Sequence, residues 1–141
     1  MTKDLPLTIL LVEDNFEHLR LTRYILRTNK VPGEVRVARD GQEAVDYLYR
    51  RNKYADASTC PTPHLILLDL NIPRIDGKEV LRIIKSDPLL KAIPVVVVSS
   101  SEREEDVRFA HEMGAAAYIS KSGGFEKLSA ELARIHNFAR R

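Results

Sequence analysis

The stretch Leu65-Ile66-Leu67-Leu68-Asp69 joins four consecutive aliphatic residues to a carboxylate. A short aliphatic run without polar interruption is typical of a strand that is covered on both faces of a parallel sheet. The same pattern recurs in three runs: Thr8-Ile9-Leu10-Leu11-Val12 before Glu13-Asp14, Val95-Val96-Val97-Val98 before Ser99, and Ala117-Tyr118-Ile119-Ser120 before Lys121. Because the carboxyl ends of parallel strands meet at one edge of a sheet, these polar residues are predicted to gather there.

Strand-like and helix-like segments alternate along the whole chain. Strands are predicted at 8–12, 34–38, 64–69, 94–99 and 116–120, and helices at roughly 15–28, 41–52, 77–86, 102–113 and 124–138. This alternation predicts a doubly wound α/β domain, (βα)5, with a parallel sheet, helices on both faces and right-handed crossovers.

The polarity of the strands predicts their order. The runs at 9–12, 65–68 and 95–98 are apolar at every position, as expected of central strands. The run at 34–38 alternates polar and apolar residues, and the run at 116–120 is mixed, so both are expected at the edges. The predicted order is 2-1-3-4-5, which is the order of flavodoxin-like sheets.

Several boundaries can be predicted from local patterns. N-caps with a carboxylate three residues later are expected at Asp40-x-x-Glu43, Asp76-x-x-Glu79 and Ser101-x-x-Glu104. The last helix is expected to pack one face on the sheet through Phe125, Leu128, Leu132 and Ile135. The polar segment between Arg51 and His64 is interpreted as an extension of the second helix followed by a flexible loop.

The composition limits the classes of function. The 141 residues carry a net charge of +2, with acidic and basic residues interleaved, which argues against nucleic acid as a partner. Cys60 is the only cysteine, so no intrachain disulfide can form, and no catalytic role is assigned to it. No apolar stretch reaches the length of a membrane span, and the N-terminus has no signal-peptide pattern. We expect residues 1–141 to be one cytoplasmic domain without an output domain or a membrane partner.

The predicted edge of the sheet has the chemistry of a magnesium-dependent phosphoryl acceptor. Glu13, Asp14 and Asp69 would repel one another unless a cation lay between them, and Mg²⁺ prefers such oxygen ligands. Lys121 would complete the charge balance. Asp69 is the candidate nucleophile, because carboxylates form aspartyl-phosphates and phosphoryl transfer needs mainly positioning and charge neutralisation.

Other residues are expected to complete this site. Glu13 and Asp14 would hold the metal, Asn71 would offer its backbone carbonyl to it, and Ser99 would donate a hydrogen bond to the phosphoryl group. Each has a simpler explanation when taken alone: a helix cap for Glu13-Asp14 and Ser99, and a solvated side chain for Lys121. Their joint placement at separate strand ends favours the site. The histidines share no ligand spacing, so structural or surface roles are expected for them.

These residues resemble the receiver domain of two-component response regulators over almost the full chain. The matching motifs are Leu11-Val12-Glu13-Asp14-Asn15, Leu67-Leu68-Asp69-Leu70-Asn71-Ile72-Pro73-x-x-Asp76-Gly77, Val97-Val98-Ser99-Ser100 and Tyr118-Ile119-Ser120-Lys121. The resemblance implies that Asp69 is the phosphoacceptor, that Glu13 and Asp14 form the acidic pocket, and that a histidine kinase is the donor. It also implies that Ser99 and Lys121 bind the phosphoryl group.

The resemblance further implies a switch surface and a subgroup. Tyr118 matches the aromatic switch position, although a tyrosine that merely packs at the edge strand is the alternative. The surface formed by 102–113, 116–120 and 124–138 is expected to be the output face and the contact of a phosphorylation-sensitive homodimer. The chain resembles stand-alone receivers that partner phytochrome-type histidine kinases. It departs from the family at Ser122, where proline is usual, and this favours a trans Lys121–Ser122 bond.

Other functions compete with this interpretation. An aspartyl-nucleophile phosphatase of the haloacid dehalogenase type would need a second Asp two residues after the nucleophile, where this chain has Asn71. A phosphorylation-independent adaptor would not need the complete acidic set. A flavin carrier with the same sheet order would need a phosphate-binding loop after the first strand. We therefore expect a receiver that is not an enzyme in the conventional sense, although it would catalyse its own phosphorylation and dephosphorylation.

Overall fold

The computed structural model describes residues 7–56 and 58–139. They include a parallel sheet of five strands in the order β2-β1-β3-β4-β5. The strands are β1 Thr8–Val12, β2 Glu34–Ala38, β3 Leu65–Leu68, β4 Val95–Ser99 and β5 Ala117–Ser120. The predicted fold class and strand order are confirmed, and β2 and β5 lie at the edges as expected.

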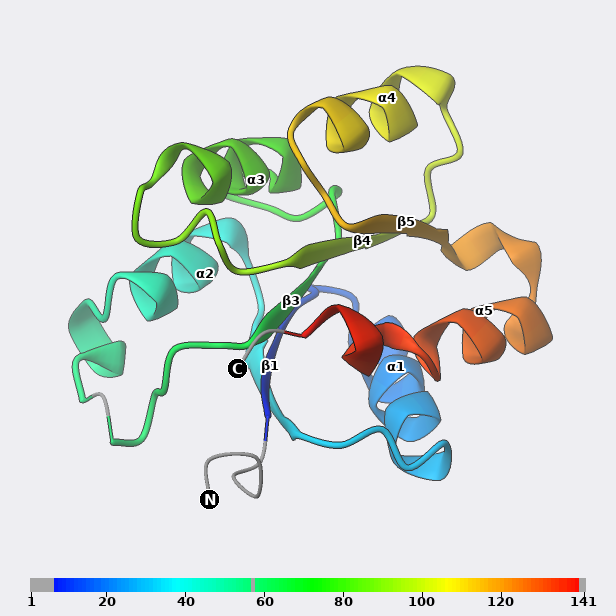
Figure 1. The fold of residues 1–141 in the computed structure, drawn as a ribbon, viewed down its shortest axis with the longest axis horizontal. Helices are drawn as coiled ribbons and strands as arrows, with labels where there is room; N and C mark the ends of the chain where they lie inside the picture. The colour runs from blue at the N-terminus through cyan, green and yellow to red at the C-terminus, as the bar shows by residue number, and fades with distance from the viewer. Residues whose placement is uncertain (1–6, 57, 140–141) are drawn as a thin grey trace.

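Helices cover both faces of the sheet (Figure 1). Helices α1 (Phe16–Thr28) and α5 (Phe125–Leu132) lie on one face, and α2 (Gly41–Leu48), α3 (Gly77–Ser86) and α4 (Glu104–Glu112) lie on the other. Short 3-10 segments are present at η2 (Asn52–Tyr54), η3 (Lys121–Gly123) and η4 (Ile135–Phe138). In the described part of the chain, no helix has the length and apolar character needed to cross a membrane.

Successive side chains of each strand point to opposite faces of the sheet, and this divides the core into two layers. Leu10 and Val12 of β1 pack with α2, α3 and α4, whereas Ile9 and Leu11 pack with α1 and α5. Every residue of β1, β3 and β4 is buried, but β2 buries only Ala38. Full burial on both faces explains why the central strands are aliphatic except at Thr8 and Ser99, since each aliphatic side chain there enters one layer of the core.

Two predicted helices are longer than the observed ones. The helix predicted over 41–52 ends at Leu48, because Arg50 and Asn52 have φ values of 53° and 54°, which a right-handed helix cannot include. The helix predicted over 124–138 also divides, since α5 ends at Leu132 and a separate 3-10 turn follows.

The predicted burial of the apolar face of the last helix is confirmed for three of its four residues. Leu128, Leu132 and Ile135 are buried, but Phe125 is 52% exposed. Phe125 is the first residue of α5 and comes directly after Gly124, so it lies at the helix end rather than over the sheet. The prediction that Phe125 packs in the core is therefore wrong.

The predicted N-caps are confirmed for α2 and α3 but not for α4. Asp40 and Asp76 accept hydrogen bonds from the backbone N–H groups of Glu43 and Glu79. Helix α4 instead begins after Arg103, which makes no side-chain cap. The Ser101 hydroxyl accepts from the Arg103 N–H and donates to Asp106, so a contact with the first turn of α4 replaces the expected cap.

The start of α3 packs directly on the chain that follows β3. A Cβ atom at Gly77 would lie 2.4 Å from the carbonyl oxygen of Asp69 and 2.4 Å from the Cα of Leu70. The Gly77 N–H also donates to the Leu70 carbonyl over 3.0 Å. The absence of a side chain at Gly77 thus permits the close approach that fixes the backbone beside Asp69.

We expect Gly77→Ala to lower the free energy of unfolding by about 1–3 kcal/mol, because the new methyl group must displace backbone rather than a mobile side chain. Urea unfolding measures this change. Gly123→Ala is the matched control, since a Cβ there meets only the flexible Lys127 side chain, and its Cδ lies 2.8 Å away. Equal stability of Gly77→Ala and wild type would contradict the packing argument.

Candidate functional site

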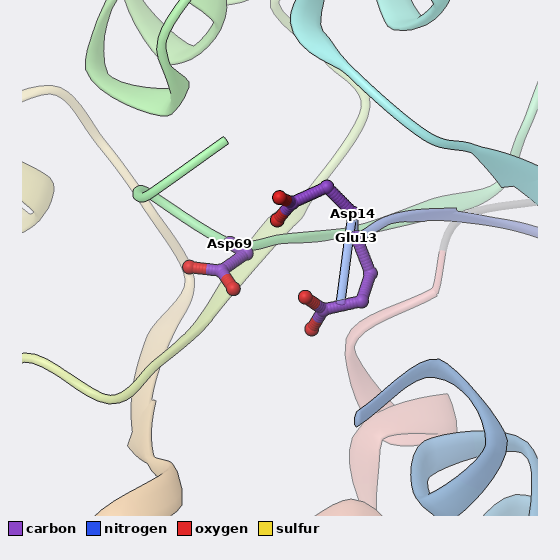
Figure 2. A group of neighbouring side chains, drawn as sticks. All are labelled: Glu13, Asp14 and Asp69. Atoms are coloured by element: carbon purple, nitrogen blue, oxygen red, sulfur yellow. The ribbon is translucent and has the colours of Figure 1, made fainter. Parts of the chain in front are cut away.

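Strand register places the predicted acidic residues together. Val12 of β1 pairs with Leu68 of β3, so Glu13 and Asp69 are the next residues at the same edge of the sheet. The Asp69 N–H donates to the Val12 carbonyl and the Glu13 N–H donates to the Ala38 carbonyl, which continues the strand pairing past the strand ends. Figure 2 shows Glu13 and Asp14 leaving the end of β1 beside Asp69, which leaves the end of β3.

The three carboxylates are close enough to share one cation. Glu13, Asp14 and Asp69 each offer an oxygen atom, and these atoms lie within 4.8 Å of one another. Glu13 and Asp69 are 2% and 6% exposed, whereas Asp14 reaches the solvent to a greater extent. Pairs of like charges at this distance repel by about 3 kcal/mol at an effective dielectric constant near 20. A donor set made only of carboxylate oxygens fits a hard divalent ion.

Lys121 provides the positive charge that the sequence predicted. Its ammonium nitrogen lies 2.5 Å from Oε1 of Glu13 and 2.8 Å from Oδ2 of Asp69, and its side chain is 9% exposed. It also lies 3.1 Å from Nδ1 of His18, a contact that the sequence did not predict. Lys121 neutralises one of the three carboxylates, so two negative charges remain for a divalent ion to balance.

The protonation of Glu13 reflects these opposing influences. Burial raises the pKa of Glu13 above its ordinary value, while the hydrogen bond and the charge of Lys121 lower it. The negative charge on Asp69 adds to the rise. Lys121 therefore opposes the effect of burial on Glu13, but burial is the larger influence and the pKa stays above its ordinary value.

Asp69 is held at both of its carboxylate oxygens. Lys121 donates to Oδ2, and the backbone N–H of Asn71 donates to Oδ1 over 2.9 Å. The contact from the Asn71 N–H was not predicted, and the use of its carbonyl as a metal ligand stays a prediction. These two donors fix the orientation of the carboxylate.

The chain around Lys121 has the geometry expected for serine at position 122. The Lys121–Ser122 bond is trans. The Ser122 hydroxyl donates to the Ser100 carbonyl over 2.9 Å, and the Ser122 N–H donates to the Ser120 hydroxyl over 3.1 Å. Hydrogen bonds to the β4–α4 loop therefore hold the turn that presents Lys121.

Ser99 and Tyr118 belong to one hydrogen-bonded group beside the acidic residues. Ser99, at the end of β4, is fully buried, and its hydroxyl oxygen accepts from the N–H of Ser101 over 3.2 Å. The Tyr118 hydroxyl donates to the Ser101 carbonyl over 2.8 Å, and the Tyr118 side chain packs against the core. Ser101 therefore connects the strand end of Ser99 to the aromatic ring on β5.

An ion pair that the sequence did not predict joins α4 to α3, and Ser101 contacts the carboxylate of that pair. The Ser101 hydroxyl donates to Oδ2 of Asp106 over 2.5 Å, and Lys78 of α3 lies 2.5 Å from Oδ1 of Asp106. The side chain of Asp106 is 9% exposed. A carboxylate in the first turn of a helix gives no sequence signal for this contact, because helix N-termini favour acidic residues in any case.

The comparisons with known proteins agree with this geometry. The sequence model of the response regulator receiver domain family matches residues 9–133. The chain belongs to the response regulator receiver domain family. It is 41% identical to the response regulator Rcp1 of Synechocystis sp. over 94% of this chain and 88% of that protein.

Solved structures of phytochrome response regulators have the same fold as this receiver domain. The phosphorylated cyanobacterial phytochrome response regulator RcpA superposes with a TM-score of 0.85 and 44% identity, covering 96% of this chain and 94% of that one. The Mn²⁺-bound form of Rcp1 has a TM-score of 0.84 and 41% identity, covering 94% of each chain. The receiver domain described here is thus homologous to phytochrome response regulators, as the sequence motifs predicted.

Asp106→Asn is expected to destabilise the receiver domain in a pH-dependent way. The hydrogen bonds from Lys78 and Ser101 hold the pKa of Asp106 below its usual value, although burial opposes them. The ionised carboxylate therefore contributes stability above the unfolded pKa of about 3.9, and this contribution is lost as the pH falls through the lower folded pKa. We expect a loss of about 1–2 kcal/mol at pH 7 that shrinks below about pH 4.

Urea unfolding of wild type and Asp106→Asn across this pH range measures the difference. Glu112→Gln, which removes an exposed carboxylate from the end of α4, is the matched control for the change in net charge. In the Lys78→Met background, Asp106→Asn should cost less than it does in wild type, since the ion pair is already absent. A difference between wild type and Asp106→Asn that stays constant from pH 7 to pH 3 would contradict the assignment.

Proposed function

We propose that this receiver domain accepts a phosphoryl group on Asp69 from the phosphohistidine of a histidine kinase. The observation that supports the proposal most strongly is the position of the Asp69 carboxylate, which contacts Lys121 and shares a three-carboxylate site with Glu13 and Asp14. In the transfer, an Asp69 oxygen forms a bond to phosphorus while the bond from phosphorus to the histidine nitrogen breaks. The histidine nitrogen keeps the electron pair of that bond.

Glu13, Asp14 and Asp69, with the backbone carbonyl of Asn71, would hold Mg²⁺. The ion would neutralise charge on the phosphoryl oxygens during transfer. Lys121 would pair with the phosphoryl group once it is attached, and the Ser99 hydroxyl would donate to one of its oxygens. The N–H of Asn71 and the ammonium of Lys121 orient the carboxylate before transfer, so little reorganisation of the side chain is needed.

The hydrogen bonds around Ser101 support a route from this site to the surface. For Ser99 to meet a phosphoryl oxygen, its hydroxyl would have to exchange its present contact with the Ser101 N–H. Ser101 also contacts Tyr118 and Asp106, so the proposed rearrangement would reach β5 and α4 together. Phosphorylation would thereby favour one of two arrangements of the face formed by α4, β5 and α5.

This face is the proposed contact of a phosphorylation-sensitive homodimer. Phe125, the first residue of α5, is 52% exposed, and Phe138, in the η4 turn that follows α5, is 37% exposed, so both could offer a partner apolar area to bury. A phytochrome-type histidine kinase is the proposed donor, since RcpA and Rcp1 are the relatives described above. We also propose that residues 1–141 act as one receiver domain, and the cytoplasmic location stays a prediction.

Asp69→Asn should abolish labelling by acetyl phosphate in the presence of Mg²⁺, because an amide cannot act as the phosphoryl acceptor. Intact-protein mass spectrometry should detect one added phosphoryl group on wild type and on the charge control Glu112→Gln. Undiminished labelling of Asp69→Asn would rule out Asp69 as the acceptor.

The same proteins test the donor and the dimer. A phytochrome-type kinase should label wild type faster than a kinase from an unrelated pathway does. By light scattering, the phosphorylated wild type should form a larger particle than Asp69→Asn treated in the same way. An unchanged particle size at high protein concentration would remove the dimer from the proposal.

Divalent cations should stabilise the receiver domain by relieving the repulsion among the carboxylates. At a Mg²⁺ or Mn²⁺ concentration of about 100 times Kd, the free energy of unfolding should rise by about 2.7 kcal/mol. Asp14→Asn should lose most of this increase, although it should not destabilise the metal-free protein, since it removes a repulsive charge. Thermal unfolding with and without the cation measures both effects, and Glu112→Gln should respond as wild type does. A full response in Asp14→Asn would exclude the site.

A further inference from the structure

Lys121 has a third partner besides the two carboxylates, and this partner comes from α1. An ammonium group has three N–H bonds and no acceptor. Its neighbours here are Oε1 of Glu13 at 2.5 Å, Oδ2 of Asp69 at 2.8 Å and Nδ1 of His18 at 3.1 Å. Since Lys121 can only donate, Nδ1 of His18 must be the acceptor. This hydrogen bond requires the tautomer of His18 that carries its proton on Nε2.

The start of α1 directs His18 toward this contact. Asn15 is the N-cap of α1, and its side chain accepts from the His18 N–H over 2.9 Å. A glutamate at position 18 would complete a capping box by accepting from the N–H of the cap residue. In this chain Oε2 of Glu13 already accepts that N–H over 3.2 Å, so the side chain at position 18 is available for another role.

His18 differs in kind from the other two partners of Lys121. Glu13 and Asp69 belong to the three-carboxylate site and would also be engaged by a divalent ion or by the phosphoryl group. When a divalent ion or the phosphoryl group is bound, Glu13 and Asp69 would interact less strongly with the Lys121 ammonium. Nδ1 of His18 lies outside the set of atoms that could share the ion, so neither the ion nor the phosphoryl group would compete directly for that nitrogen.

We propose that His18 is a positioning residue, which holds the Lys121 ammonium beside Asp69 while the carboxylates bind other groups. The inference rests on the proposed phosphorylation of Asp69. His18 touches neither the phosphoryl group nor the metal in this proposal and acts through Lys121. Its removal should slow phosphorylation without changing the affinity for a divalent ion.

His18→Leu and His18→Asn form a matched pair of variants. Asparagine places an acceptor oxygen close to the position of Nδ1, and leucine has nearly the same shape without an acceptor. His18→Leu should lower the rate of labelling by acetyl phosphate by about two- to tenfold, the effect of one hydrogen bond, and His18→Asn should restore most of the rate. The affinity for Mn²⁺ should be the same in both variants and in wild type.

Nitrogen-15 spectra of the imidazole provide a readout that does not depend on the reaction. In wild type, Nδ1 of His18 should have the shift of an unprotonated, hydrogen-bonded nitrogen, and that shift should move in Lys121→Met. A proton on Nδ1 would overturn the contact itself.

The outcomes separate this inference from the proposed function. If wild type is not labelled, the proposed function fails. If wild type is labelled and both variants keep its rate, or if His18→Asn is as slow as His18→Leu, the positioning role of His18 is overturned while the acceptor remains established. A change in Mn²⁺ affinity that parallels the change in rate would also overturn it, since the effect would then belong to the metal site.

Discussion

The structure depends on the electrostatic balance at the carboxyl end of β1 and β3. Parallel pairing forces the residues that follow Val12 and Leu68 to the same edge, where Glu13, Asp14 and Asp69 offer oxygen atoms within 4.8 Å of one another. Lys121 opposes this repulsion by contacting two of the three carboxylates. Two negative charges remain for a cation to balance in the proposed metal site, and Lys121 opposes the rise that burial causes in the pKa of Glu13. This charge balance fits both the proposed metal binding and the proposed phosphoryl transfer.

The surroundings of the site make this arrangement rigid. The backbone beside Asp69 is fixed by the close approach of α3 at Gly77, and the Lys121 turn is fixed by hydrogen bonds to the β4–α4 loop. Ser101 lies between them and contacts Ser99, Tyr118 and Asp106. Each of these contacts is a directional hydrogen bond in a largely buried setting. A change at the site would therefore replace one hydrogen-bond partner by another rather than stretch an existing bond. Such a group of contacts suits a switch with two arrangements.

Local patterns predicted the framework well because burial dictates them directly. Strands covered on both faces are predominantly aliphatic, which made β1, β3 and β4 recognisable. Edge strands keep polar residues, and this predicted the order of the sheet. The failures occurred where local sequence leaves several outcomes open. The second helix ends early through positive φ values at Arg50 and Asn52; asparagine is enriched in this conformation, but arginine gives no signal for it. The Ser101 side chain contacts Asp106, in the first turn of α4, where its sequence position predicted a cap for Glu104.

The sequence alone determined which residues end the strands, and from that the membership of the acidic site followed, because a parallel sheet has one carboxyl edge. Tertiary structure decided which of these residues touch. His18 and Lys121 are 103 positions apart, and their contact depends on how α1 sits over the end of β5. The ion pair between Lys78 and Asp106 depends likewise on the spacing of α3 and α4. The periodicity of apolar residues in the sequence predicts which face of a helix or strand a residue occupies. A hydrogen bond requires two elements to be placed within a few tenths of an ångström, and only the packing of the core fixes their positions that closely.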